Sequence, residues 1–265
     1  MQVITSTGLS AGSTHQLPDG DLAEVAQWCG VDHATASAAQ VATAPRLVVS
    51  GRLASGKDTV AAAVMTDLGH TDSVQVSFAT ALRDEMAVLL DAVRSCTDIE
   101  SAVLAVARAG SVPTETARPT ATLLWQAVSQ DPAITPWTRT REMRLALQDW
   151  GTDVRRAADP HHWVKLGARR TLEAISTGRA VHITDARFAN EVQIARSLGF
   201  HAVRLEVDLD VRSRRLWDRD GLTIDPASEN HPSEAELETY RGFDQWVSNN
   251  GALSDTVSAV TAVMR

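Results

Sequence analysis

One stretch of the sequence decides the fold: Leu47-Val48-Val49-Ser50-Gly51-Arg52-Leu53-Ala54-Ser55-Gly56-Lys57-Asp58-Thr59. Its first four residues form a short, mostly apolar run, which is typical of a strand buried on both faces. The next seven residues fit the pattern G-x-x-x-x-G-K between this strand and a helix. In that setting, backbone N–H groups and the helix N-terminus form a cradle for phosphate. The stretch therefore predicts a phosphate-binding loop; the alternative is a glycine-rich turn with an incidental lysine.

The loop residues have different predicted tasks. The glycines let the backbone curl around a phosphate, and Lys57 brings a compact positive charge to it. Asp58 follows Lys57 where the pattern normally has a serine or threonine that binds Mg²⁺, and Thr59 comes one position later. Either Asp58, through water, or Thr59, through its hydroxyl, is a candidate for the metal. The predicted cofactor-binding residues of the loop are Gly51, Ala54, Ser55, Gly56, Lys57, Asp58 and Thr59.

Strands and helices alternate after the loop. A helix over 57–68 ends before Gly69, and a helix over 189–198 ends before Gly199, which is the usual residue type at that position. Apolar runs predict further strands at 74–78, 181–184 and 202–207. This order predicts an α/β fold with three layers, α/β/α, and a parallel sheet of about five strands.

The chain divides into an N-terminal extension, 1–45, and a main domain, 46–265. The extension contains no lysine or arginine, and Asp21 to Ala39 predict two short helices broken at Gly30. We therefore expect a small helical cap or a partly disordered arm. Within the main domain, 78–178 shows helical patterns and no clear strand, with breaks at Pro113, Pro119, Pro132 and Pro136.

The composition excludes several classes of protein. The 265 residues carry a formal net charge of -8, which argues against nucleic acid as a general partner. No apolar run approaches the roughly 18 residues of a membrane span, and no signal peptide is evident. Cys29 and Cys96 stand far apart, which argues against a zinc site or a disulfide framework. These features predict a soluble protein of the cytoplasm with no membrane partner.

Four segments together resemble a known family, the deoxynucleoside monophosphate kinases encoded by bacteriophages. The resemblance spans residues 46 to about 260 and does not include the extension. Arg83, Arg155 and Ala189 depart from it, at positions where the family has Lys, Gly and often Pro. The segments are Ser55-Gly56-Lys57-Asp58-Thr59, Arg144 to Arg156 with Asp159-Pro160-His161-His162-Trp163-Val164-Lys165, Thr184-Asp185-Ala186-Arg187-Phe188-Ala189-Asn190-Glu191, and His231-Pro232-Ser233-Glu234 with Asn249-Asn250-Gly251.

The resemblance implies a phosphate-loop (P-loop) kinase of the nucleoside monophosphate kinase superfamily. Such an enzyme moves the γ-phosphate of ATP, with Mg²⁺, to a (deoxy)nucleoside 5′-monophosphate and forms the diphosphate. It implies that 78–178 is the helical acceptor-binding region and 208–230 a short lid. The host cytoplasm is the implied location if the chain is phage-encoded, and a homodimer is a possible assembly.

The end of the third strand holds two further candidates. Asp185 follows the apolar run at its carboxyl end, where open α/β sheets bind ligands. It could hold Mg²⁺ through water or accept a proton; the alternative is an N-cap for the helix that follows. Arg187 points to the same side, and the resemblance gives it the acceptor phosphate. The predicted catalytic residues are Lys57, Asp185, Arg187 and Arg215, and the predicted metal residues are Asp58, Thr59 and Asp185.

The acceptor-binding region offers a second group. Arg144 and Gln148 are four residues apart and share a helix face, where Gln148 could read a base edge and Arg144 could meet the monophosphate. The alternative is a solvated helix face. Trp150 and Trp163 suit either stacking on a base or core packing, and we expect core packing for Trp150. With the resemblance, the predicted substrate-binding residues are Arg83, Arg144, Gln148, Arg156, Trp163, Arg187 and Glu191.

The lid prediction depends on three arginines. Arg212, Arg215 and Arg219 share a helix face, as expected of a lid that closes over phosphates, with Arg212 and Arg219 on the nucleotide. The alternative is a surface helix with acid-then-base pairs, in which Asp208 and Asp210 pair with the arginines four residues later.

Only two lysines occur beside 23 arginines. A lysine is expected at position 57, because a planar guanidinium would collide with the interior of the loop. Lys165 closes a segment that resembles the acceptor side, and it could face substrate or solvent.

Two other functions stay open at this point. One is a kinase of the same fold that acts on a modified nucleotide or on a hydroxymethylated base in DNA. The other is a non-catalytic, regulatory nucleotide-binding module whose extension binds a partner or DNA, although the absence of basic residues in the extension argues against DNA. The kinase hypothesis predicts that activity largely survives removal of 1–45. The base and sugar accepted, and the roles of His231 and Glu234, are not decided by the sequence.

Overall fold

A parallel sheet of five strands forms the centre of the molecule. The computed structural model describes residues 17–18, 21–225, 229 and 235–265. The strand order is β2-β3-β1-β4-β5, and every neighbouring pair is parallel. The prediction of an α/β fold with about five parallel strands is confirmed. The strands are β1 (Arg46–Ser50), β2 (Val74–Val76), β3 (Val181–Ile183), β4 (His201–Glu206) and β5 (Gln245–Ser248).

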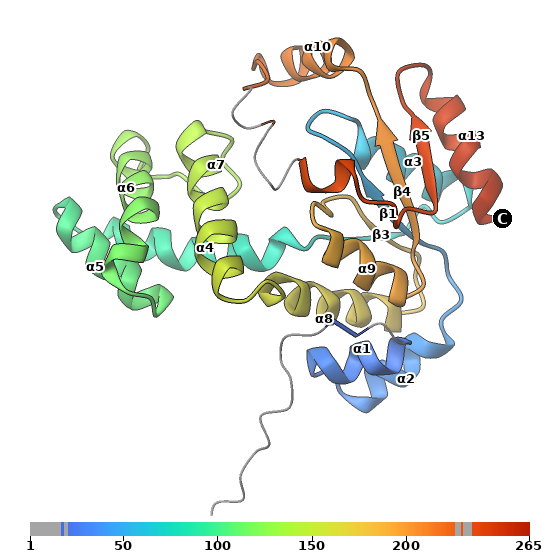
Figure 1. Cartoon of the computed structure of the whole chain (residues 1–265), viewed down its shortest axis with the longest axis horizontal. Coiled ribbons are helices and arrows are strands. Elements are labelled where there is room, and N and C mark those ends of the chain that lie inside the picture. Colours follow the sequence, from blue (N-terminus) through green and yellow to red (C-terminus); the bar gives the residue numbers. More distant parts are fainter. Residues whose placement is uncertain (1–16, 19–20, 226–228, 230–234) are drawn as a thin grey trace, which may run out of the picture.

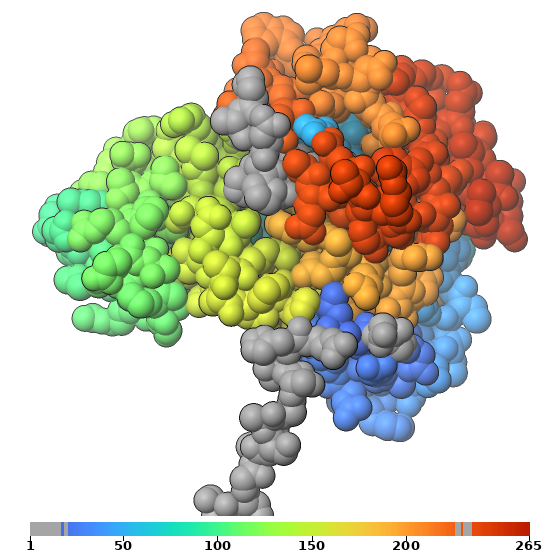
Figure 2. All heavy atoms as spheres, viewed as in Figure 1, coloured from blue at the N-terminus to red at the C-terminus, as the bar shows by residue number. Residues whose placement is uncertain are grey.

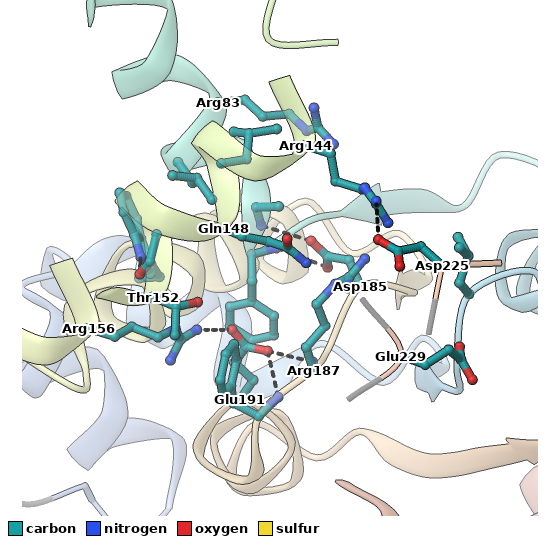
Figure 3. Close-up of a pocket in the computed structure, with 18 of the residues that line it drawn as sticks. Arg83, Arg144, Gln148, Thr152, Arg156, Asp185, Arg187, Glu191, Asp225 and Glu229 are labelled. Atoms are coloured by element: carbon teal, nitrogen blue, oxygen red, sulfur yellow. Dashed lines mark hydrogen bonds and ion pairs between the residues drawn. The ribbon is translucent and has the colours of Figure 1, made fainter. Parts of the chain in front are cut away.

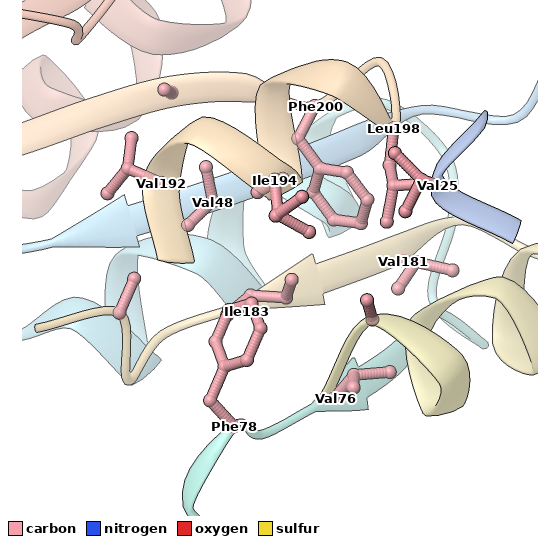
Figure 4. Packing of buried hydrophobic residues seen from close by; sticks show 14 of the residues in the cluster. Val25, Val48, Val76, Phe78, Val181, Ile183, Val192, Ile194, Leu198 and Phe200 are labelled. Carbon is pink, nitrogen blue, oxygen red and sulfur yellow. The ribbon is translucent and has the colours of Figure 1, made fainter. Parts of the chain in front are cut away.

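Helices cover both faces of this sheet (Figure 1). Alternate residues of a strand point to opposite faces, so Val48 joins one core while Leu47 and Val49 join the other. The first core includes α8 (His162–Ser176) and α9 (Ala189–Ser197), as Figure 4 shows for part of it. The second includes α3 (Lys57–Asp67) and α13 (Leu253–Met264). The arrangement agrees with three layers, α/β/α.

A helical region with its own core stands beside the sheet (Figure 1). Trp150 is fully buried in it, as predicted, and a Cβ on Gly110 would lie 2.3 Å from the Trp150 ring. Glycine at position 110 is therefore required for this close packing. The elements are α4 (Ala79–Arg94), α5 (Ile99–Gly110), α6 (Thr114–Gln130), α7 (Arg141–Gln148) and the π-helix η1 (Asp149–Arg156).

The described part of the N-terminal extension is a pair of helices. α1 (Leu22–Cys29) and α2 (His33–Val41) are separated at Gly30, as the sequence predicts, and begin at the side-chain caps Asp21 and Asp32. Both pack on α8 (Figure 1). Val25, Ala26 and Ala39 belong to the core that also contains β1 and β3. The cap is thus continuous with the sheet core.

The loops at the carboxyl edge of the sheet carry the remaining elements. α10 (Leu209–Asp220) follows β4, and the short 3₁₀-helix η2 (Glu236–Glu238) precedes β5. Among the described ranges, no helix is long and apolar enough to cross a membrane. His231 and Glu234 lie outside the described residues, as does part of the predicted lid, 226–228 and 230.

Candidate functional site

The predicted phosphate loop, residues 51–57, forms a tight turn between β1 and α3. Lys57 is the first residue of α3, and its Nζ donates to the carbonyls of Gly51 at 2.8 Å and Arg52 at 2.9 Å. A Cβ on Gly51 would lie 2.5 Å from Ser55 Oγ. Gly56 has φ of 86°, a conformation that favours glycine. The two glycines of the pattern are therefore required by the geometry of the loop.

Buried polar atoms without partners surround this turn. Ser55 Oγ and Arg215 Nη1 are buried and have no hydrogen-bond partner in the described part of the chain. Arg215 Nη2 donates to Asn249 O at 2.8 Å, and Asn249 Nδ2 donates to Ser55 O at 2.8 Å. A Cβ on Gly56 would lie 2.9 Å from Asn249 Nδ2 and 3.8 Å from Arg215 Nη1. Buried donors without a partner are costly, and a phosphate oxygen bound at this turn would accept hydrogen bonds from both groups. Their position therefore fits a phosphate site.

Glu229 joins the loop to α10. Its carboxylate accepts from Arg212 at 2.8 and 2.9 Å and from Arg52 at 2.7 Å. Hydrogen bonding from Arg212 lowers the pKa of Glu229 below its ordinary value. Arg212 also approaches Leu53 O at 3.4 Å and is buried. Glu229 was not identified from the sequence, because its partners lie far from it along the chain.

The structure brings only two of the three lid arginines to the loop. Arg212 and Arg215 reach the loop or its neighbour Asn249, whereas Arg219 pairs with Asp220 at 2.7 Å on the surface. In the described part of the chain, Arg219 therefore contacts its acidic neighbour and not the loop. Arg219 lies in the last turn of α10, next to its acidic partner. Of the predicted surface pairs, Asp210 and Arg214 approach to 3.9 Å, while Arg212 pairs with Glu229 instead of Asp208.

The predicted metal residues do not form a cluster. Asp58 Oδ1 accepts from Gln75 Nε2 at 3.2 Å and from Thr184 Oγ1, and Thr59 is exposed. No group of three His, Cys, Asp or Glu residues that could hold a metal occurs within the described ranges. A magnesium ion usually keeps several waters and takes one or two carboxylates together with substrate phosphates. Asp58 is next to Lys57 and could supply the single carboxylate that such a magnesium ion needs.

Asp185 has a structural task that the sequence did not reveal. Its carboxylate accepts from the backbone N–H of Phe78 at 3.1 Å, the N–H of Ala79 at 2.8 Å and the Ser77 hydroxyl at 2.5 Å. Asp185 therefore caps the N-terminus of α4, and not the helix that follows it in sequence. The same side chain lines a pocket beside the loop.

This pocket lies between the helical region and the carboxyl ends of the strands (Figure 3). In Figure 2, blue atoms of the segment that follows β1 are visible in a hollow beside the orange α10. Leu53 of the loop lines the pocket together with Asp185, Phe78 and Phe188. All seven predicted substrate-binding residues line it as well: Arg83, Arg144, Gln148, Arg156, Trp163, Arg187 and Glu191.

One wall of the pocket is a continuous helix that changes from α-helical to π-helical geometry at Asp149. Arg144, Gln148, Thr152 and Arg156 are four residues apart, and all line the pocket. In an α-helix each four-residue step overshoots one turn by about 40°, so such a row drifts around the axis. The π-helix η1 has longer turns, with i→i+5 bonds, and reverses this drift. It thereby keeps Thr152 and Arg156 on the pocket side.

Two polar groups of this wall make no hydrogen bond within the described ranges: the Gln148 amide and the Thr152 hydroxyl. Arg144, in contrast, lies 3.5 Å from Asp225. In Figure 3, the side chains of Gln148 and Asp185 point toward the same space. Thr152 was not among the predicted site residues, because only the π-helix brings it to the face that Gln148 occupies.

Arg156 and Glu191 form a buried ion pair at the bottom of the pocket. The Arg156 guanidinium stacks 3.8 Å from the centre of the Phe188 ring and donates to Glu191. Glu191 also accepts from the backbone N–H of Arg187 at 2.7 Å and of Phe188 at 3.2 Å. Burial raises the pKa of Glu191, and the charge of Arg156 opposes this shift. Glu191 was predicted to bind substrate, but both of its oxygens are engaged with the protein.

Arg83 and Trp163 shape the other side. The Arg83 guanidinium lies 4.5 Å from the centre of the Trp137 ring and donates to Pro136 O. Burial lowers the pKa of Arg83, and the nearby charge of Asp185 opposes this shift. Trp163 is buried, and its Nε1 donates to Gly151 O at 2.8 Å. Trp163 is thus a fixed wall of the pocket rather than an exposed platform.

Comparison with known proteins adds little. No family model and no curated protein matches the chain. Among solved structures, the crystal structure of TT1252 from Thermus thermophilus is similar, with a TM-score of 0.40 and 18% identity. The alignment covers 83% of this chain and 97% of that chain. A similarity this low carries no argument about function.

Proposed function

We propose that the protein transfers the γ-phosphate of MgATP to a (deoxy)nucleoside 5′-monophosphate and forms the diphosphate. One observation supports this most directly: the phosphate loop and the arginine-lined pocket share a wall at Leu53. Two adjacent places for anions suit a reaction in which a phosphoryl group moves between two phosphates. The resemblance to the phage kinases points to the same reaction.

The loop supplies the donor side of this proposal. MgATP would supply the phosphoryl group and neutralise part of its charge. The loop N–H groups, Lys57 and Arg215 would hold the phosphates, because their donors converge on the turn. Glu229 keeps Arg212 and Arg52 fixed around the loop. Asp58 would bind Mg²⁺ through water.

The pocket supplies the acceptor side. Arg187, Arg83 and Arg144 bring positive charge to the end of the pocket where the acceptor phosphate would lie. Asp185 balances part of that charge and fixes the first turn of α4, the helix that carries Arg83. These residues position two phosphates and exclude water, which is most of what phosphoryl transfer demands of a protein.

The nucleoside part of the acceptor would fill the apolar part of the pocket. Phe78, Leu82, Phe188 and Trp163 provide apolar walls, as expected for a small-molecule site. Gln148, whose amide makes no hydrogen bond in the described part of the chain, would contact the polar edge of the base. Arg156 is held by Glu191, so its role is to shape the wall.

A coupled assay of ADP release tests the proposal. We expect wild-type protein to release ADP with at least one of eight nucleoside monophosphates, and Lys57→Ala to release none. DNA that contains a hydroxymethylated base serves as a separate acceptor. Activity with that DNA alone would favour the other kinase hypothesis, and ATP binding without turnover would favour the non-catalytic module.

A further inference from the structure

The N-terminal cap touches the elements that carry the pocket. α1 packs on α8 and also contacts α9. Trp163 belongs to the first turn of α8, and Glu191 belongs to the first turn of α9. Both residues line the pocket. The cap therefore lies directly behind the wall on which the proposed acceptor would rest.

Trp28 makes the contact at the start of α8. Its ring centre lies 6.1 Å from that of His161 in an edge-on arrangement. Lys165 Nζ lies 5.3 Å from the centre of the same indole ring, within the range of a cation–π interaction. These two partners stand two positions before and two after Trp163. Lys165 therefore contacts the cap, a partner that the sequence did not suggest.

The start of α8 also contacts the start of α9 through Asn190. Asn190 Nδ2 donates to Pro160 O at 2.9 Å and lies 3.3 Å from His161 Nδ1. Asn190 immediately precedes Glu191, which holds Arg156 by an ion pair. His161 is thus the point where α1, α8 and α9 meet.

The contact of Trp28 with α8 is made by its ring and not by its N–H group. Trp28 Nε1 and Asn190 Oδ1 are buried and have no hydrogen-bond partner in the described part of the chain. The contacts of the indole with the α8 terminus are therefore made by the ring itself. Loss of the ring would leave a void beside His161, and surrounding structure fills such voids only partly.

We propose that Trp28 is a positioning residue for the acceptor pocket, acting through His161 and Asn190 on the first turns of α8 and α9. The effect on catalysis rests on the proposed function. The cap then has a part in acceptor binding, in contrast to the sequence-based expectation that activity largely survives removal of 1–45. Because the ring contacts of Trp28 are with His161 and Lys165 of the α8 start, we expect ATP binding to be unaffected.

The full chain offers a matched control in the same helix. Val25 is fully buried in α1 and lies beside Leu198, at the far end of α9 from Asn190 (Figure 4). Val25→Ala removes buried apolar surface from the cap without touching His161. Trp28→Phe keeps an aromatic ring in place, whereas Trp28→Ala removes it.

Two measurements test the proposal. In hydrogen exchange of the ligand-free protein, Trp28→Ala should speed exchange over 160–165 and 188–191, and Val25→Ala should not. In kinetics, Trp28→Ala should raise the acceptor KM about fivefold while the ATP KM changes less than about twofold. Trp28→Phe should bring both the exchange rates and the acceptor KM most of the way back to wild type.

Equal behaviour of Trp28→Ala and Val25→Ala in both measurements would overturn the proposal, because the cap would then contribute stability alone. If wild-type protein shows no transfer to any nucleotide, the proposed function fails. The exchange comparison still decides whether Trp28 holds the two helix starts, and unchanged exchange there would refute it.

Discussion

The predicted phosphate loop is built from one continuous run of sequence, whereas the pocket beside it is built from six separate segments. Within residues 51–57, the Lys57 ammonium is held by two carbonyls of the loop itself, those of Gly51 and Arg52. The pocket takes its residues from the loop, the start of α4, the α7–η1 helix, the start of α8, the segment after β3, and Ile224, Asp225 and Glu229 after α10. A single change in the loop should therefore disable the site, whereas a single change in the pocket should weaken it.

The largest effect is expected at Lys57. Lys57→Arg keeps the charge, but two loop carbonyls lie within 3 Å of the compact ammonium, and we expect a planar guanidinium to collide with them. We expect turnover to fall on the order of a thousandfold, as measured by ADP release, with an unchanged fold by circular dichroism. An active Lys57→Arg protein would contradict the loop geometry.

Gly56 tests whether the loop conformation itself matters. Gly56→Ala places a Cβ 2.9 Å from Asn249 Nδ2 at φ of 86°, and we expect turnover to fall about a hundredfold. Gly178 has φ of 74° with nothing within 4 Å, so Gly178→Ala carries the same backbone cost without the contact. Both variants should lose about 1 to 3 kcal/mol in urea unfolding. Equal turnover in Gly56→Ala and Gly178→Ala would show that the loop conformation at Gly56 has no special importance for the reaction.

Arg187 should show the smaller effect expected of the pocket. Arg187→Ala removes one of several positive charges, so we expect the acceptor KM to rise about tenfold with little change in the ATP KM. Arg214 is an exposed arginine on α10, 3.9 Å from Asp210, and does not line the pocket. Arg214→Ala serves as the control. A rise in the ATP KM alone would place Arg187 on the donor side.

Thr152 should show the smallest effect. Thr152→Val keeps the shape of the side chain and removes the hydroxyl that faces the pocket, so we expect the acceptor KM to rise about threefold. Thr152→Ser keeps the hydroxyl and should remain close to wild type. The effect is measured as the acceptor KM for nucleotides with several different bases. Equal KM values for the Val and Ser variants would show that the Thr152 hydroxyl does not contact the acceptor.

The sequence predicted local features well because their signals are local. The loop, the first four strands and the two cap helices follow from short patterns of apolar residues, glycines and caps. β5 was not located, because it is a four-residue strand at the sheet edge with one buried residue. The shared face of Arg144 and Gln148 follows from helical periodicity.

The rest of the site depends on contacts between distant segments. Asp185 caps α4 from more than a hundred positions away, and Glu229 reaches two arginines of different elements. A π-helix cannot be predicted from helical periodicity, so Thr152 was missed. Arg155, a departure from the phage kinases, braces the helical region: it pairs with Glu85, donates to Gly110 O at 2.9 Å and stacks 4.9 Å from the Trp150 ring centre.

Transfer of label from γ-³²P-ATP to nucleoside monophosphates tests the central claim most directly. If the loop and the pocket hold two phosphates side by side, label should appear in a nucleoside diphosphate in step with ADP release. Lys57→Ala should abolish both signals. Release of ADP at the same rate without any acceptor, or no label in any of the eight possible diphosphates, would contradict the account.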